Sequence, residues 1–308
     1  MTTRESDSTT PDAEPIRSAE INIPDLFIHL RLHFQLLLAP IFLWGFYLAG
    51  GAFSLDFWLA FVAFHVFLYG GTTAFNSYYD RDEGPVGGLE NPPPVDAMLL
   101  PFALVMQAIG AALTVFVNGP VFVAYLLIFA MGAAYSHPRI RLKARPIGGL
   151  LTVAIGQGLL AALAGWFTAQ PALASITALG WVGITGVTLV TTGFYPITQI
   201  YQIDEDLARG DLTFAAWAGP QGAFAFAIVL QAIALPMLFW VLLQVAGLWQ
   251  ALLVTLFFVG LLLSILQWAR TYDPAAVVAN FRRVMRTYQT TSVGFLLFLA
   301  AHLAYRSL

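Results

Sequence analysis

Nine apolar stretches, separated by polar breaks, fill most of the chain after residue 33. A helix needs roughly 20 mainly apolar residues to cross a bilayer, and each stretch is about that long. The stretches are residues 34–52, 54–78, 96–117, 119–137, 147–168, 174–198, 221–245, 247–269 and 288–306. A bilayer has no water to satisfy exposed backbone groups, so stretches of this kind span it as helices. The sequence therefore predicts an all-α integral membrane protein, a bundle of nine transmembrane helices.

The composition agrees with this fold class. Hydrophobic residues make up 59% of the 308 positions and charged residues only 10%, which is typical of multi-pass membrane proteins. The chain has no cysteine, so disulfides and thiolate chemistry are excluded. Residues 1–20 are polar, and we expect a disordered cytoplasmic tail there without a cleaved signal peptide. Residues 21–308 then form one transmembrane domain. No His-based zinc pattern and no nucleic-acid surface is present.

The basic residues predict how the bundle is oriented. Of the 14 Lys and Arg, only Arg306 falls on the side opposite the N-terminal tail and the longer loops. Cytoplasmic loops carry an excess of positive charge, so we expect the N-terminus and the long loops in the cytoplasm. Nine spans then place the C-terminus outside.

Two acidic segments follow directly on the second and the sixth span. Six of the 17 Asp and Glu lie at residues 80, 82, 83, 204, 205 and 206. Both segments fall on the predicted cytoplasmic face, together with the basic residues 139–145. The simpler alternative to a binding site is that these are solvent-exposed Asp and Glu side chains of loops between helices. Carboxylates near a bilayer are costly unless they bind something, however, and the repetition favours a shared polar cavity.

The spacing within each segment places oxygen ligands on one helical face. Asn76 and Asp80 are four residues apart, as are Gln202 and Asp206, so each pair shares a face. Mg²⁺ prefers a few carboxylates together with water and substrate phosphate. The expected metal ligands are Asn76, Asp80, Asp82, Glu83, Glu205 and Asp206. Arg31, Arg141 and Lys143, the only lysine, would add positive charge for a phosphorylated substrate.

At these residues the chain resembles the UbiA-type superfamily of intramembrane prenyltransferases. The first signature of that family, N-x-x-x-D-x-x-x-D, is matched by Asn76, Asp80 and Gly84. The second, D-x-x-x-D followed by G-x-x-T, is matched by Gln202, Asp206, Gly210 and Thr213. Residues 135–143, YSHPRIRLK, are similar to the family's Y-S-x-P…R-x-K stretch. Gly84 and Gln202 depart from the pattern, because both positions are expected to hold a metal-binding aspartate.

The resemblance implies an activity in isoprenoid biosynthesis. Mg²⁺ and basic side chains would bind the diphosphate of a polyprenyl donor, and an allylic carbocation would form beside aromatic rings and be attacked by a lipophilic acceptor. The expected catalytic residues are Asp80, Lys143 and Asp206. The expected diphosphate-binding residues are Arg31, Asn76, Tyr135, Ser136, Arg141, Lys143 and Gln202. The aromatic candidates are Phe75, Tyr78, Tyr79, Tyr135, Tyr195 and Tyr201.

Two other functions remain open from the sequence. A non-transferase relative, which binds isoprenoids or cyclises them, is suggested by Gly84 and Gln202. A transporter is the third possibility, although transport sites tend to lie near the bilayer midplane on broken helices, whereas these acids lie at one membrane face. The sequence does not identify the acceptor or the length of the donor.

Overall fold

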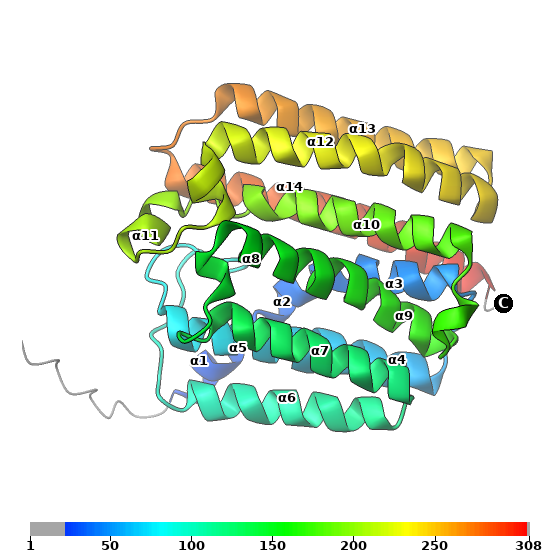
Figure 1. The fold of residues 1–308 in the computed structure, drawn as a ribbon, viewed down its shortest axis with the longest axis horizontal. Helices are drawn as coiled ribbons and strands as arrows, with labels where there is room; N and C mark the ends of the chain where they lie inside the picture. Colours follow the sequence, from blue (N-terminus) through cyan, green and yellow to red (C-terminus); the bar gives the residue numbers. More distant parts are fainter. Residues whose placement is uncertain (1–21, 307–308) are drawn as a thin grey trace, which may run out of the picture.

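The computed structural model describes residues 22–306, and this range is helical apart from its loops and a single bridge between Val86 and Leu89. The long helices lie side by side and run along one common direction (Figure 1). The α-helices are α1 (Ile23–Ile28), α2 (Leu32–Gln35), α3 (Ala39–Leu48), α4 (Leu55–Val62), α5 (Tyr69–Asp80), α6 (Leu99–Val115), α7 (Gly119–Ser136), α8 (Pro146–Thr152), α9 (Ala161–Ala169), α10 (Ala178–Ile197), α11 (Ile203–Ala208), α12 (Phe214–Val245), α13 (Leu248–Thr271) and α14 (Val277–Arg306). The tail expected at residues 1–20 lies outside the described range.

Seven helical segments within residues 22–306 are long and apolar enough to cross a membrane. They are Ile23–Leu48, Leu55–Asp80, Gly119–Ser136, Pro146–Ala169, Ala178–Ile197, Phe214–Val245 and Leu248–Thr271. Two further expected spans correspond to α6, which has 17 residues, and to α14, which has 30 residues and three arginines near its start. The all-α architecture is confirmed, and the count of nine crossings stays a prediction.

The helices begin and end at different residues from the expected spans. α12 begins at Phe214, where the hydroxyl of Thr213 accepts a hydrogen bond from the Ala216 amide, but Gly219 has a non-helical backbone, with φ 71°, and kinks it. Its long continuous part therefore starts at Pro220, next to the expected residue 221. α14 begins at Val277 rather than at residue 288. Hydropathy marks where a helix is apolar, whereas backbone hydrogen bonding continues into the polar turns beyond. The second and fifth spans also contain π-helical turns at Ala63–Leu68 and Val153–Leu160.

α3 is the central helix of the bundle. Its residues from Ala39 to Tyr47 are all buried. It packs directly on α9, where glycines allow the two backbones to approach. A side chain at Gly45 would overlap the Ala162 carbonyl, and one at Gly165 would overlap the Phe42 carbonyl. Small residues at a close crossing are typical of membrane helices, and this crossing fixes the middle of the bundle.

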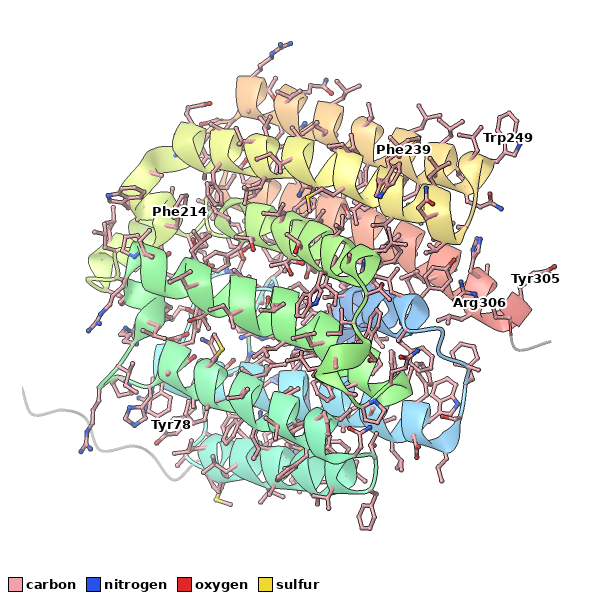
Figure 2. The ribbon with its side chains drawn as sticks, turned by 45° about the vertical axis from the view of Figure 1, so that its right-hand side comes forward. Tyr78, Phe214, Phe239, Trp249, Tyr305 and Arg306 are labelled. Atoms are coloured by element: carbon pink, nitrogen blue, oxygen red, sulfur yellow. The ribbon has the colours of Figure 1, made fainter. Side chains whose placement is uncertain are left out.

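The two ends of the bundle differ in character. Trp249, Tyr305 and Arg306 lie together at one end, and Tyr78 and Phe214 lie at the other (Figure 2). Trp249 and Tyr305 are 78% and 80% exposed, as expected for aromatic anchors at a membrane surface. Arg306 donates a hydrogen bond to the Tyr47 carbonyl at 3.0 Å. Tyr78 and Phe214 adjoin the two acidic segments, so both acidic segments lie at the end opposite Arg306.

Candidate active site

A cavity of about 310 Å³ extends from the acidic end into the middle of the bundle. Its charged lining includes Asp80 and Asp206, which lie at or near helix ends. Its apolar lining includes Leu238, Phe258 and Phe295, which lie well inside α12, α13 and α14. The cavity therefore has a charged mouth and an apolar interior.

Asp80 lies at the C-terminal end of α5, directly at this mouth. The helix ends there because Arg81 adopts the left-handed conformation, with φ 51°. The Asp80 side chain is 1% exposed, and its Oδ1 lies 2.5 Å from the Nζ of Lys143. One turn earlier, the Asn76 amide donates to the hydroxyl of Ser136 at the end of α7, at 2.8 Å. These contacts join the first signature to the segment after α7.

Arg141 and Asp211 complete a first charged cluster. Arg141 also has a left-handed backbone, with φ 45°, and its guanidinium donates two hydrogen bonds to Asp211 at 2.7 and 2.8 Å. Its second contact is with Asp80, at 3.6 Å, and Lys143 lies 3.8 Å from Asp211. We call Asp80, Arg141, Lys143 and Asp211 the Lys143 group. It joins α5, the segment after α7 and the segment after α11.

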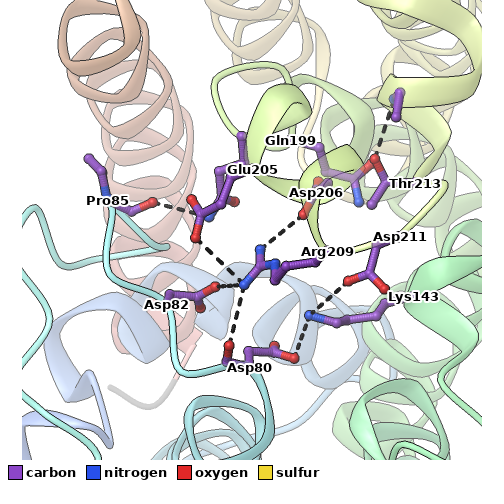
Figure 3. Close-up of polar contacts among 12 residues, drawn as sticks. Asp80, Asp82, Pro85, Lys143, Gln199, Glu205, Asp206, Arg209, Asp211 and Thr213 are labelled. Atoms are coloured by element: carbon purple, nitrogen blue, oxygen red, sulfur yellow. Dashed lines mark hydrogen bonds and ion pairs between the residues drawn. The ribbon is translucent and has the colours of Figure 1, made fainter. Parts of the chain in front are cut away.

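Arg209 is the centre of a second charged cluster (Figure 3). It follows Glu205 and Asp206 by four and three residues, so all three side chains share a face. Its guanidinium lies 2.5 Å from Asp82, 3.1 Å from Asp206 and 3.6 Å from Glu205. It also donates to the backbone carbonyl of Asp80 at 3.4 Å. We call Asp82, Glu205, Asp206 and Arg209 the Arg209 group. It connects the two acidic segments directly.

The pKa values in these clusters reflect burial and neighbouring charge. Burial raises the pKa of Asp206 to about 6, against the opposing effect of Arg209 and Lys143. Burial likewise raises the pKa of Glu205. Burial alone would lower the pKa of Arg209, but its hydrogen bond and ion pairs with the carboxylates raise it on balance. The arginine therefore stays charged, while the carboxylates lie where negative charge is costly unless a cation is close.

The two positions that depart from the family signatures also lie at the mouth. Gln202 donates a hydrogen bond to the Pro85 carbonyl at 3.1 Å. A Cβ added at Gly84 would lie 3.1 Å from Oε2 of Glu205. Gln202 and the loop after α5 are therefore in contact, as the predicted convergence of the two signatures requires.

Two other expected site residues form no ion pair with either charged cluster among residues 22–306. Arg31 donates hydrogen bonds to the Ser77 hydroxyl at 2.7 Å and to the Gly87 carbonyl at 3.2 Å. Glu83 is exposed and does not line the cavity. Their roles as a diphosphate ligand and a metal ligand stay predictions.

Aromatic side chains line the cavity below the mouth. Tyr135 and Tyr195 have their hydroxyl oxygens 3.1 Å apart, and the Gln199 amide donates to Tyr195 at 2.9 Å. Of the six aromatic candidates, Tyr135, Tyr195 and Tyr201 line the cavity and Phe75, Tyr78 and Tyr79 do not. Tyr69 and Tyr288, which the sequence analysis did not single out, line it as well. Closeness to a signature along the sequence therefore does not predict which aromatic side chains line the cavity.

Two charged residues of the site, Arg209 and Asp211, were not among those predicted from the sequence. Both lie in the second acidic segment, and the spacing of Arg209 from Glu205 and Asp206 was a usable signal. Asp211 gave no such signal, because its partners Arg141 and Lys143 lie about 70 residues away. Only the folded chain brings that contact together.

The donor atoms at the mouth suit a hard divalent cation in kind, because they are carboxylate and amide oxygens. They are not gathered around one point. Within residues 22–306, no three His, Asp or Glu side chains are placed to hold a metal ion. Asp80 faces Lys143, and the carboxylates of the Arg209 group face Arg209. An ion would therefore bind here only together with a shift of these side chains.

The comparisons with known proteins identify the family. The model of the UbiA prenyltransferase family matches residues 38–289. The chain belongs to this family. It is accordingly an integral multi-pass membrane protein and a prenyltransferase family member. A comparison with curated proteins finds no match.

Solved structures of UbiA homologues share the fold. A UbiA homologue from Archaeoglobus fulgidus bound to DMAPP and Mg²⁺ is 20% identical, with a TM-score of 0.66, and the match covers 90% of this chain and 99% of the other. The apo structure of a UbiA homologue from Aeropyrum pernix K1 is 23% identical, with a TM-score of 0.65 and coverage of 90% and 98%. The Archaeoglobus homologue has also been solved with GPP and Mg²⁺, at 19% identity, a TM-score of 0.64 and coverage of 91% and 99%.

Proposed function

We propose that this protein transfers a prenyl group from a polyprenyl diphosphate to a lipophilic acceptor within the membrane, in a Mg²⁺-dependent reaction. The observation that carries the proposal is one continuous cavity with a charged mouth and an apolar, aromatic interior. Both family signatures meet at this mouth. A prenyl diphosphate has the same division, with a strongly charged head and an apolar tail. The Archaeoglobus UbiA homologue has been solved with DMAPP and Mg²⁺ and with GPP and Mg²⁺, which agrees with this match between cavity and ligand.

In this proposal the diphosphate binds at the mouth. Lys143 supplies a compact positive charge. Arg141 holds Asp211 through Nε and Nη2, and its Nη1 faces Asp80 and adds positive charge that suits phosphate oxygens. Asn76, Asp80 and Asp206 would hold Mg²⁺ beside them. When bound there, Mg²⁺ would supply positive charge that neutralises the diphosphate as it leaves. Lys143 lies only 2.5 Å from Asp80, so one buried pair would serve both metal and phosphate.

The interior of the cavity performs the other part of the reaction. Breaking the allylic C–O bond leaves a carbocation, which aromatic faces stabilise electrostatically. Tyr69, Tyr195 and Tyr288 line the cavity and are placed for that role. Leu238, Phe258 and Phe295 exclude water, so that the cation survives until the acceptor attacks.

A cyclase-like or isoprenoid-binding relative is the second candidate. Gly84 and Gln202 favour it, because two expected ligands are absent. The two candidates differ in what happens to the prenyl group, since a cyclase consumes no acceptor. A carrier, the third function considered from the sequence, would instead produce flux of a substrate across proteoliposomes.

The test is an assay of purified full-length protein with geranylgeranyl diphosphate, Mg²⁺ and a pooled lipid extract. We expect pyrophosphate release that depends on both Mg²⁺ and the extract, with a prenylated lipid detected by mass spectrometry. Release that is independent of the extract, with a cyclised hydrocarbon as product, would favour the cyclase. Absence of release from donors of every chain length would contradict the proposal.

A further inference from the structure

The two departures from the family signatures meet at one contact. Gly84 faces Oε2 of Glu205, and Gln202 bonds to the carbonyl of Pro85, the residue next to Gly84. The aspartates expected at positions 84 and 202 would therefore stand close to each other, between the loop after α5 and the start of α11. Their absence therefore removes two negative charges from the same part of the site.

Arg209 lies beside this contact. The same Glu205 side chain that faces Gly84 through Oε2 lies 3.6 Å from Arg209 through Oε1. Arg209 also reaches Asp82 of the first acidic segment and Asp206 of the second. One guanidinium thus joins carboxylates from both segments, as an ion shared by paired carboxylates would. Unlike a bound ion, it is covalently fixed and always charged.

The two groups at the mouth differ in formal charge before any substrate binds. The Lys143 group has two basic and two acidic side chains and is balanced. The Arg209 group has one arginine against three carboxylates, which leaves a formal charge of −2. One divalent ion balances that charge. Aspartates at 84 and 202 would add two more negative charges, enough for a second divalent ion.

We propose that Arg209 is a built-in cation that replaces one of two divalent ions, so that this protein binds its prenyl diphosphate with a single Mg²⁺. The inference rests on the proposed function. It adds to that function a role for Arg209 and a number of metal ions. In this role Arg209 positions the diphosphate. Its positive charge compensates for the absence of aspartate at positions 84 and 202.

The test counts bound ions directly. Purified full-length protein is titrated with Mn²⁺ in the presence of geranyl S-thiolodiphosphate, a donor analogue that resists cleavage, and free Mn²⁺ is followed by electron paramagnetic resonance. We expect about one Mn²⁺ per chain in the wild type, because one carboxylate set remains uncompensated. We expect about two in the triple variant R209A/G84D/Q202D, in which the cation is removed and both aspartates are restored.

Two further variants separate the role of Arg209 from folding. R209K keeps a cation but loses the fork geometry, so we expect one Mn²⁺ and binding of the analogue weakened by about tenfold. R282A removes an exposed arginine that pairs with Glu90, and we expect it to match the wild type. Gel filtration of each variant monitors folding.

The outcomes distinguish this inference from the proposed function. Two Mn²⁺ per wild-type chain, with the analogue bound, would overturn the role of Arg209 and leave the prenyltransferase proposal standing. One Mn²⁺ in a folded triple variant would also overturn it. A wild type that binds neither Mn²⁺ nor the analogue would overturn the proposed function itself.

Discussion

The Lys143 group and the Arg209 group lie at the same cavity mouth but differ in how they are balanced. In the Lys143 group each carboxylate has a close basic partner, and the bidentate pair of Arg141 with Asp211 locks two distant segments together. In the Arg209 group a single arginine serves three carboxylates, and burial raises the pKa of Asp206 to about 6. The comparison indicates that the first group is balanced by its own basic side chains, whereas the second keeps a formal charge of −2.

Substitution of Lys143 should reduce turnover strongly. Lys143→Ala leaves Asp80 buried beside an empty space and removes a charge from the diphosphate site. We expect turnover to fall by about a hundredfold or more, and Lys143→Arg to restore part of it. The measurement is the initial rate of pyrophosphate release. A Lys143→Ala variant with near wild-type turnover would show that the Lys143 group is structural only.

Removal of the divalent ion should lower turnover at least as strongly, and the shape of the recovery when Mg²⁺ is added back tests the Arg209 group. Chelation is expected to abolish turnover, because the charge of −2 in this group is then unbalanced. On addition of Mg²⁺ we expect a hyperbolic recovery, with a Hill coefficient of about 1. A clearly sigmoidal recovery would indicate two cooperating ions and would contradict the asymmetry between the groups.

Asp211→Asn should reduce stability more than it reduces turnover. Asp211 is buried and accepts both hydrogen bonds from Arg141. The amide keeps the shape but loses the charge, so we expect a loss of about 1–3 kcal/mol in unfolding free energy. Thermal denaturation in detergent measures it. An unchanged midpoint would show that the segment after α11 is held by other contacts.

Arg282→Ala should have the smallest effect. Arg282 and Glu90 form an exposed pair away from the cavity lining, and exposed pairs contribute little. Turnover and thermal midpoint are both expected to match the wild type. A marked loss of turnover would mean that basic charge on this surface matters in general, which would weaken the comparison between the two groups.

The sequence predicted the parts of the site that depend on local spacing. Asn76 and Asp80 share a helix face in α5, and the segment around Lys143 adjoins Asp80 as the resemblance implied. The contact between Arg141 and Asp211 was not predictable, because no spacing rule relates two loops about 70 residues apart. The helix that contains the span expected at residues 288–306 begins earlier, at Val277, because Arg282, Arg283 and Arg286 lower the hydropathy while the helix itself continues.

The central claim is that the two acidic segments form one diphosphate site. It is tested most directly by comparing Asp80→Ala and Asp206→Ala with the wild type in Mg²⁺-dependent turnover of a prenyl diphosphate, each variant verified as folded by gel filtration. The account predicts that either substitution alone abolishes turnover, because the residues come from different segments but serve the same substrate. Normal turnover in both folded variants would contradict it.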